Sequence, residues 1–104
     1  MNKIGLTMSI YKDKADEYEK RHDEIWPELV DVLKAAGVED YSIFLESETG
    51  KLFAVLKCES TDKVDELALN AVVQKWWAYM ADIMDTNEDN SPVAKPLKQV
   101  FHLN

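Results

Sequence analysis

The sequence predicts an α+β domain in which helices cover one face of an antiparallel sheet. Three observations predict it. Apolar residues alternate with a period of two near both ends of the chain and in a central hairpin. They recur every three or four positions in two long segments between these strands. The 104 residues are about enough for one such domain, so we expect a single domain over residues 1–104.

The first strand and helix follow directly from this pattern. Residues 3–10 alternate, which predicts a strand covered mainly on one face. Residues 14–36 carry apolar side chains at helical spacing, and Gly37 is a typical residue to follow a helix. Pro27 lacks the N–H that would bond back along a helix and disfavours helical dihedrals in the residue before it. We therefore expect a kink or a break near residues 23–26.

The second half of the chain repeats the scheme with a hairpin, a helix and a strand. Residues 41–59 are two apolar runs joined by a short polar segment that ends in Gly50, which predicts a hairpin. A helix follows from about residue 61 to 84, with a bend at Asn70, and an alternating final strand covers residues 96–104. The order β-α-β-β-α-β is that of the ferredoxin-like split β-α-β fold.

The second face of the predicted sheet also needs a cover. Residues 52–56 are apolar without interruption, so this strand has apolar side chains on both faces. Pairing of two sheets in a symmetric dimer would bury the face that the helices leave open. The sequence therefore predicts a homodimer, in the form of a dimeric α/β barrel.

Charge and composition exclude several classes of function. Twenty acidic against twelve basic residues give a net charge of −8, which repels nucleic acid and anionic lipid. No segment approaches the ~20 apolar residues of a membrane span. We expect neither nucleic acid nor membrane as a partner. The single cysteine, Cys58, cannot form a disulfide within the chain, which favours a reducing cytoplasm. We expect it to be a small core residue.

His22 is the first candidate for chemistry. On one helix it lies four residues after Tyr18, so both side chains share the apolar face. A histidine there can be a hydrogen-bonded core residue or a general acid and base. Glu19 and His22 have a spacing found in metal-binding bundles, but the chain has no second copy, and we expect no metal and no cofactor. His102, near the C-terminus, suits a surface or dimer contact.

The aromatic pair Trp76 and Trp77 is the second candidate. Adjacent helical residues point about 100° apart, so one indole can enter the core while the other lines a cavity. Both can instead be core or interface residues, which is the more common role of tryptophans at such positions. Together with tyrosine hydroxyls and a histidine, such an aromatic face is suited to a sugar, whose C–H faces stack on indole.

Three stretches resemble the L-rhamnose mutarotase family: EYEKRHDEIWPELVDVLKAAGVEDYSIFL, QKWWAYMADIM and NEDNSPVAKPLKQVFHL. Their order and spacing match over essentially the whole chain, and R-H-x-x-I-W-P-E, W-W-x-Y-M and D-N-S-P are the most specific parts. The resemblance implies a dimeric ferredoxin-like fold and a cytoplasmic, cofactor-free enzyme that interconverts the α and β anomers of L-rhamnose. It further implies His22 as proton donor and Tyr18, Tyr41, Trp76 and Trp77 as sugar contacts.

Other assignments remain open on the residues alone. The base that complements His22 can be a water, a tyrosine or a carboxylate such as Asp23. A cofactor-free monooxygenase or a haem-degrading protein can be built on the same dimeric fold, because a fold does not determine a function. A non-catalytic sugar-binding or dimerisation module, in which His22 only forms hydrogen bonds, is the third possibility.

Overall fold

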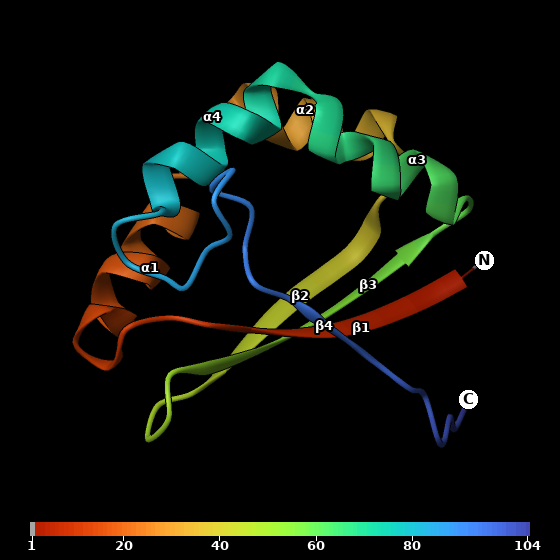
Figure 1. Ribbon diagram of the computed structural model, residues 1–104. Coiled ribbons are helices and arrows are strands. Elements are labelled where there is room, and N and C mark those ends of the chain that lie inside the picture. Colours follow the sequence, from red (N-terminus) through yellow and green to blue (C-terminus); the bar gives the residue numbers. More distant parts are fainter. Residues whose placement is uncertain (1) are drawn as a thin grey trace.

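The computed structural model describes residues 2–104 and has the predicted α+β fold. Its four strands form one antiparallel sheet in the order β2-β3-β1-β4. Figure 1 shows the helices of the described residues on one face of this sheet. The elements are β1 (Asn2–Ser9), η1 (Lys12–Lys14), α1 (Ala15–Asp23), α2 (Pro27–Ala35), β2 (Glu39–Glu46), β3 (Lys51–Cys58), α3 (Thr61–Asp65), η2 (Glu66–Leu69), α4 (Ala71–Met80) and β4 (Lys95–Leu97).

The core lies between the sheet and the helices. Because side chains alternate along a strand, every second residue of β3 faces the helices, and these residues are buried from Leu52 to Cys58. Met8 of β1 joins them, and the helices contribute buried apolar side chains such as Leu29 of α2 and Met80 of α4. Burial of these apolar side chains is the main force that holds the layers together.

The break expected before Pro27 is present. α1 ends at Asp23, Trp26 has an extended backbone (φ −63°, ψ 129°), and Pro27 is the first residue of α2. Proline is well tolerated there, because the first N–H of a helix has no partner within it. At the other end of α2, Gly37 has φ +85°, and the amide of Val38 donates to the carbonyl of Leu33 over 3.1 Å. This left-handed turn ends the helix as predicted.

The bend predicted at Asn70 is a full break, which separates η2 from α4, so the predicted helix over residues 61–84 is divided. Its backbone is extended, and its side-chain oxygen accepts hydrogen bonds from the amides of Val72 (2.9 Å) and Val73 (3.3 Å). The following helix ends at Met80, earlier than the predicted residue 84. After Met80 the chain makes a tighter turn, in which the amide of Ile83 donates to the carbonyl of Met80 over 3.1 Å, and the carbonyl of Ile83 accepts from the amide of Tyr11 over 3.0 Å.

The predicted final strand over residues 96–104 is wrong in its length. β4 comprises Lys95–Leu97, and residues 98–104 have no regular structure. Figure 1 shows this C-terminal segment leaving the sheet. Val100, Phe101 and Leu103 are more than three-quarters exposed. The segment alternates like a strand, but its apolar side chains have no surface of the described chain to pack on.

The open face of the sheet is apolar in its centre. Phe44 of β2 pairs with Phe53 of β3 on this face, and Phe44 is 64% exposed. Leu97 of β4 lies opposite Gly5 of β1 on the same face and is 46% exposed. We call Phe44, Phe53, Val55 and Leu97 the open-face patch. Within residues 2–104, no helix is long and apolar enough to cross a membrane.

Candidate active site

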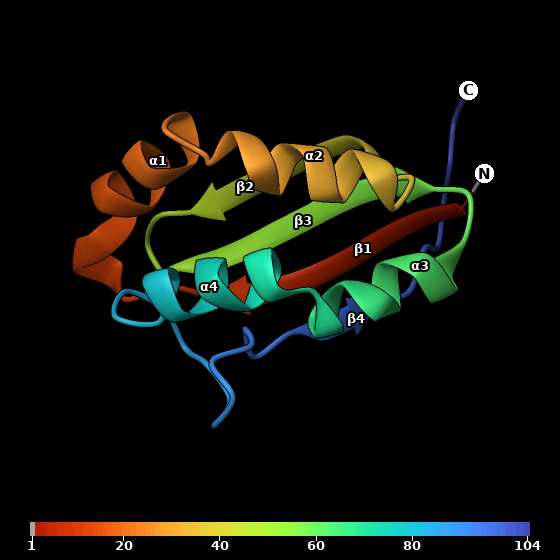
Figure 2. The ribbon, with the colours of Figure 1, turned by 90° about the horizontal axis from the view of Figure 1, so that it is seen from above.

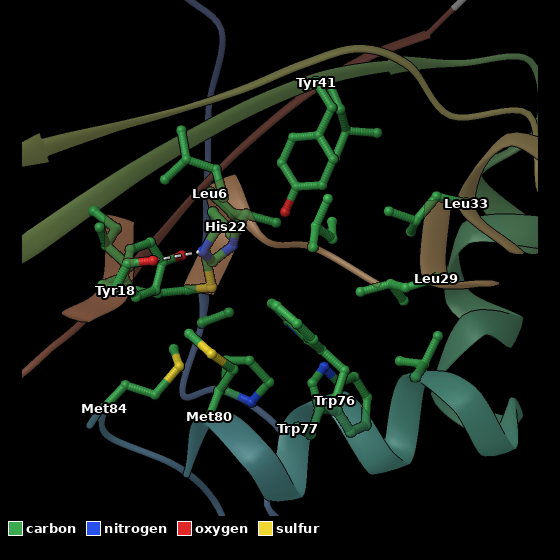
Figure 3. A pocket seen from close by; sticks show the side chains of 18 of the residues that line it. Leu6, Tyr18, His22, Leu29, Leu33, Tyr41, Trp76, Trp77, Met80 and Met84 are labelled. Carbon is green, nitrogen blue, oxygen red and sulfur yellow. Dashed lines mark hydrogen bonds between the residues drawn. The ribbon is translucent and has the colours of Figure 1, made fainter. Parts of the chain in front are cut away.

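A cavity of about 1020 Å³ lies between the helices and the sheet. In Figure 2, α1 and α2 follow one another along β2, while α3 and α4 lie on the side of β4. The cavity is mainly apolar, with Leu29, Leu52 and Met80 among its lining residues. All five residues singled out from the sequence line it: Tyr18 and His22 from α1, Tyr41 from β2, and Trp76 and Trp77 from α4 (Figure 3).

His22 is held in one orientation by its neighbours. Its Nδ1 lies 3.0 Å from the backbone carbonyl of Tyr18. Because a carbonyl only accepts, Nδ1 carries the proton and donates it, and in the neutral ring Nε2 keeps its lone pair. The imidazole stacks on the Tyr18 ring at a centroid distance of 4.3 Å and meets the Trp76 ring edge-on at 5.5 Å. The geometry therefore leaves Nε2 as the nitrogen available for proton transfer.

Burial favours the neutral forms of the histidine and the two tyrosines in the cavity. Burial lowers the pKa of His22 below its ordinary 6.5, and the opposing effects of the Tyr18 carbonyl and Asp23 are smaller. Burial, helped by the nearby Tyr41, raises the pKa of the Tyr18 phenol, and burial also raises the pKa of Tyr41. At neutral pH the imidazole is thus an available base, and both phenols remain hydrogen-bond donors.

Tyr41 reaches the cavity from an irregular part of β2. The pairing with β3 shifts register between Glu39 and Ser42, and Asp40 has a positive φ of 49°. A bulge of this kind re-aims the next side chain. Figure 3 shows the hydroxyl of Tyr41 turned into the cavity, although 42% of the residue's surface is exposed. The side chain is therefore accessible both to solvent and to a molecule in the cavity.

The two tryptophans have different environments, as their helical spacing predicted. Trp76 is 8% exposed and packs against Trp26 and Tyr79 at ring-centroid distances of 5.1 and 5.7 Å. Trp77 is only partly buried. Trp76 thus supports His22 from within an aromatic cluster, while Trp77 keeps more of its indole accessible.

Several residues near the site were not singled out from the sequence. Trp26 and Tyr79 complete the aromatic cluster, and Arg21 lies over the Tyr79 ring. Asn90 and Ser91 also line the cavity. The motifs of the family resemblance contain all of them, with Arg21 and Trp26 in R-H-x-x-I-W-P-E, Tyr79 in W-W-x-Y-M, and Asn90 and Ser91 in D-N-S-P. These motifs were the available signal, although they assigned no role to these residues.

Of the other candidates, Glu19 and Asp23 line the cavity, whereas Cys58 and His102 lie outside its lining. Cys58 is completely buried in the core, in line with its predicted structural role. His102 is exposed, and its ring nitrogens lie 3.3 Å from Nζ of Lys3 and 2.8 Å from the side-chain oxygen of Asn104. In the part of the chain that the structure describes, no three acidic, histidine or cysteine side chains are placed to hold a metal ion.

Fold and site together define a ferredoxin-like α+β protein with a histidine-bearing aromatic cavity. The family model for L-rhamnose mutarotase matches residues 3–103, and the chain belongs to this family. An L-rhamnose mutarotase from Shouchella clausii is 56% identical over 99% of both chains. The crystal structure of an L-rhamnose mutarotase from Formosa agariphila matches with a TM-score of 0.94, at 44% identity and full coverage of both chains.

More distant structures share the fold alone. A dimeric ferredoxin-like protein from an uncultured marine organism matches with a TM-score of 0.64 at 15% identity, over 98% of this chain and 97% of that one. A protein from Nitrosomonas europaea that is described as an antibiotic biosynthesis monooxygenase matches with a TM-score of 0.63 at 11% identity, over 97% of this chain and 100% of that one. The monooxygenase alternative therefore rests on the fold alone.

Proposed function

We propose that this protein is a cofactor-free isomerase that interconverts the α and β anomers of L-rhamnopyranose. The observation that carries the proposal is the setting of His22. Its Nδ1 is bonded to the Tyr18 carbonyl, its Nε2 has no hydrogen-bond partner among residues 2–104, and it lies in an aromatic cavity beside neutral phenols. The chain belongs to a family described by this activity, and its relatives carry the same description.

His22 carries the proton in ring opening. Neutral Nε2 takes the proton of the anomeric hydroxyl, the C1–O1 bond becomes a carbonyl, and the bond between C1 and the ring oxygen breaks. The resulting imidazolium then donates that proton to the ring oxygen. Both oxygens are attached to C1, so one nitrogen can serve them in turn. His22 is thereby the proton donor that the family resemblance implies, and it regenerates its own neutral form.

Ring closure is the reverse sequence after a rotation. Turning about C1–C2 presents the other face of the aldehyde to the ring hydroxyl. Nε2 then takes the proton of that hydroxyl as it adds to C1 and returns it to the carbonyl oxygen. General acid–base help of this kind is typically worth about 10² to 10⁴ in rate, which suits a reaction that already proceeds slowly in water.

The other four residues hold the sugar. The indole of Trp77 offers a face for the sugar C–H groups, and Trp76 closes the cavity behind His22. The phenols of Tyr18 and Tyr41 stay protonated and donate hydrogen bonds to sugar oxygens, where negative charge develops during opening. A neutral sugar is also compatible with the net charge of −8.

We also propose that the enzyme is a cytoplasmic homodimer. The open-face patch and the exposed apolar residues of the C-terminal segment are the surfaces that a second copy would cover. A protein with the same fold is described as dimeric. The cytoplasmic location is favoured by a single buried cysteine, which a reducing compartment keeps as a thiol.

The catalytic assignment is tested by comparing two histidine variants. Saturation-transfer NMR of equilibrated L-rhamnose measures exchange between the anomeric proton signals. His22→Ala should reduce the enzymatic exchange rate by about 10² to 10⁴, while the matched control His102→Ala should exchange like the wild type. Folded His22→Ala with the wild-type rate would refute the role of His22. A Soret band on adding haemin would favour the haem alternative.

A further inference from the structure

Arg21 connects α1 to the C-terminal end of α4. Its Nη1 donates to the backbone carbonyl of Tyr79 and to Oδ1 of Asp82, each over 2.8 Å, and its Nη2 donates to Oδ2 of Asp82 over 3.2 Å. Its Nε donates to Glu17 of its own helix over 2.7 Å. Only 11% of the arginine side chain is exposed. A bidentate ion pair of this kind fixes the orientation of the guanidinium as well as its distance from the carboxylate.

The place where Arg21 binds is favourable for a cation. The carbonyl of Tyr79 is among the last of α4, where carbonyls lack partners within the helix and carry partial negative charge. The guanidinium carbon also lies 4.4 Å from the centroid of the Tyr79 ring, a cation–π contact. Asp82, which holds the other side of the guanidinium, has its pKa lowered mainly by this hydrogen bond.

The Tyr79 ring that Arg21 contacts is connected to His22 through Trp76. Tyr79 packs against Trp76 at 5.7 Å, and Trp76 meets the His22 ring at 5.5 Å. His22 is the residue after Arg21, so one turn of α1 presents the arginine to the end of α4 and the histidine to the cavity. The helix that carries both residues ends at Asp23, because the helical conformation is interrupted before Pro27. Its last turn therefore depends on side-chain contacts for its position.

We propose that Arg21 is a positioning residue that docks the last turn of α1 on the end of α4 and so sets His22 against Trp76. The expected effect on kcat rests on the proposed function. The expected effect on the position of His22 does not. Loss of the arginine lets the last turn of α1 shift while Tyr41 and Trp77 remain on other elements. The proton transfer is then impaired more than sugar binding, and a displacement of about 1 Å can cost about 10² in rate.

The variants Arg21→Met, Arg21→Lys and Lys20→Met test this. Methionine keeps the apolar stem of Arg21 without its donors, and lysine keeps the charge without the planar fork. Lys20 is exposed on the same helix, so Lys20→Met removes one charge without touching the docking contacts. For Arg21→Met we expect kcat to fall about tenfold to a hundredfold with KM changed less than about threefold. Arg21→Lys should be intermediate, and Lys20→Met should match the wild type.

A second readout does not depend on activity. The chain has two histidines, so NMR titration with His102→Ala as an assignment aid follows His22 alone. The groups facing it are the rings of Tyr18 and Trp76 and the carboxylate of Asp23. Arg21→Met should raise the titration midpoint of His22 toward 6.5, because an undocked ring is better hydrated. Wild-type kcat and midpoint in folded Arg21→Met would overturn the inference. Loss of thermal stability alone, with both values unchanged, would also overturn it.

The two proposals can fail separately. If the wild type does not exchange rhamnose anomers but Arg21→Met still shifts the His22 midpoint, the positioning role stands and the proposed function falls. Asp82→Asn supplies a further check on the partner. If Arg21 acts through Asp82, Asp82→Asn also raises the titration midpoint of His22. The double variant Asp82→Asn with Arg21→Met then raises this midpoint no further than Arg21→Met alone. Fully additive shifts would contradict that pairing.

Discussion

Phe44 provides a quantitative test of the proposed dimer. A phenylalanine side chain buries about 150 to 250 Å², and 64% of Phe44 is exposed on the open sheet face, which leaves about 100 to 160 Å² for a partner to cover. At about 25 cal/mol per Å², covering it stabilises by about 2.5 to 4 kcal/mol per copy. A symmetric dimer contains two copies. Since alanine keeps part of the contact, Phe44→Ala should cost about 4 kcal/mol per dimer, or about a thousandfold in Kd.

Analytical ultracentrifugation over a concentration series measures this change. The matched control is Leu69→Ala, because Leu69 is 80% exposed but lies in η2, on the helical side of the sheet. We expect Leu69→Ala to associate like the wild type. A wild-type protein that sediments as a monomer would refute the dimer. An equal Kd for Phe44→Ala and wild type would show that the open-face patch is not the interface.

Three further predictions concern the site and the fold. The rate of anomer exchange should rise with pH and level off above a midpoint below 6.5, because burial lowers the pKa of His22 and the neutral ring begins the reaction; a rate that falls with pH across this range would require the protonated ring instead. Asn70→Ala should lower the free energy of unfolding by about 1 kcal/mol in urea denaturation, because the amides of Val72 and Val73 lose their cap. Gly37→Ala should cost about 1 to 2 kcal/mol in the same assay, because φ is +85° there while an added Cβ meets no close neighbour; an unchanged unfolding midpoint would show that the turn relaxes.

Local signals were sufficient for much of the fold. Pro27 and Asn70 interrupt their helices where their chemistry predicts, and the alternation of β1 identifies the face that packs on the helices. These features depend on one residue and its nearest neighbours in sequence. The helical spacing of Tyr18 and His22 likewise predicted that they share a face, and both line the cavity.

Features that depend on distant partners were not predictable in the same way. The bulge at Asp40 and the early end of α4 are set by pairing with other segments. The alternation of residues 98–104 is real, but a strand forms only where a neighbour offers both hydrogen bonds and a surface to cover. The contacts of Arg21 with Tyr79 and Asp82 span about half the chain, so no local spacing predicts them.

The site also combines features that local sequence predicts with features that depend on distant contacts. Residue types indicated an acid–base histidine and aromatic side chains, and the structure brings Tyr41, Trp76 and Trp77 to the cavity that holds His22. The tautomer of His22 could not be inferred from spacing, because it depends on the carbonyl that its Nδ1 meets.

The most direct test of the central claim is the rate of anomer exchange of L-rhamnose as a function of enzyme concentration. The rate is measured by saturation-transfer NMR at equilibrium, with and without a metal chelator. We predict that exchange increases in proportion to the enzyme concentration and is unchanged by the chelator, because the proposed mechanism moves the proton through His22 without a metal ion. Exchange that stays at the buffer rate at every enzyme concentration would contradict the proposed function.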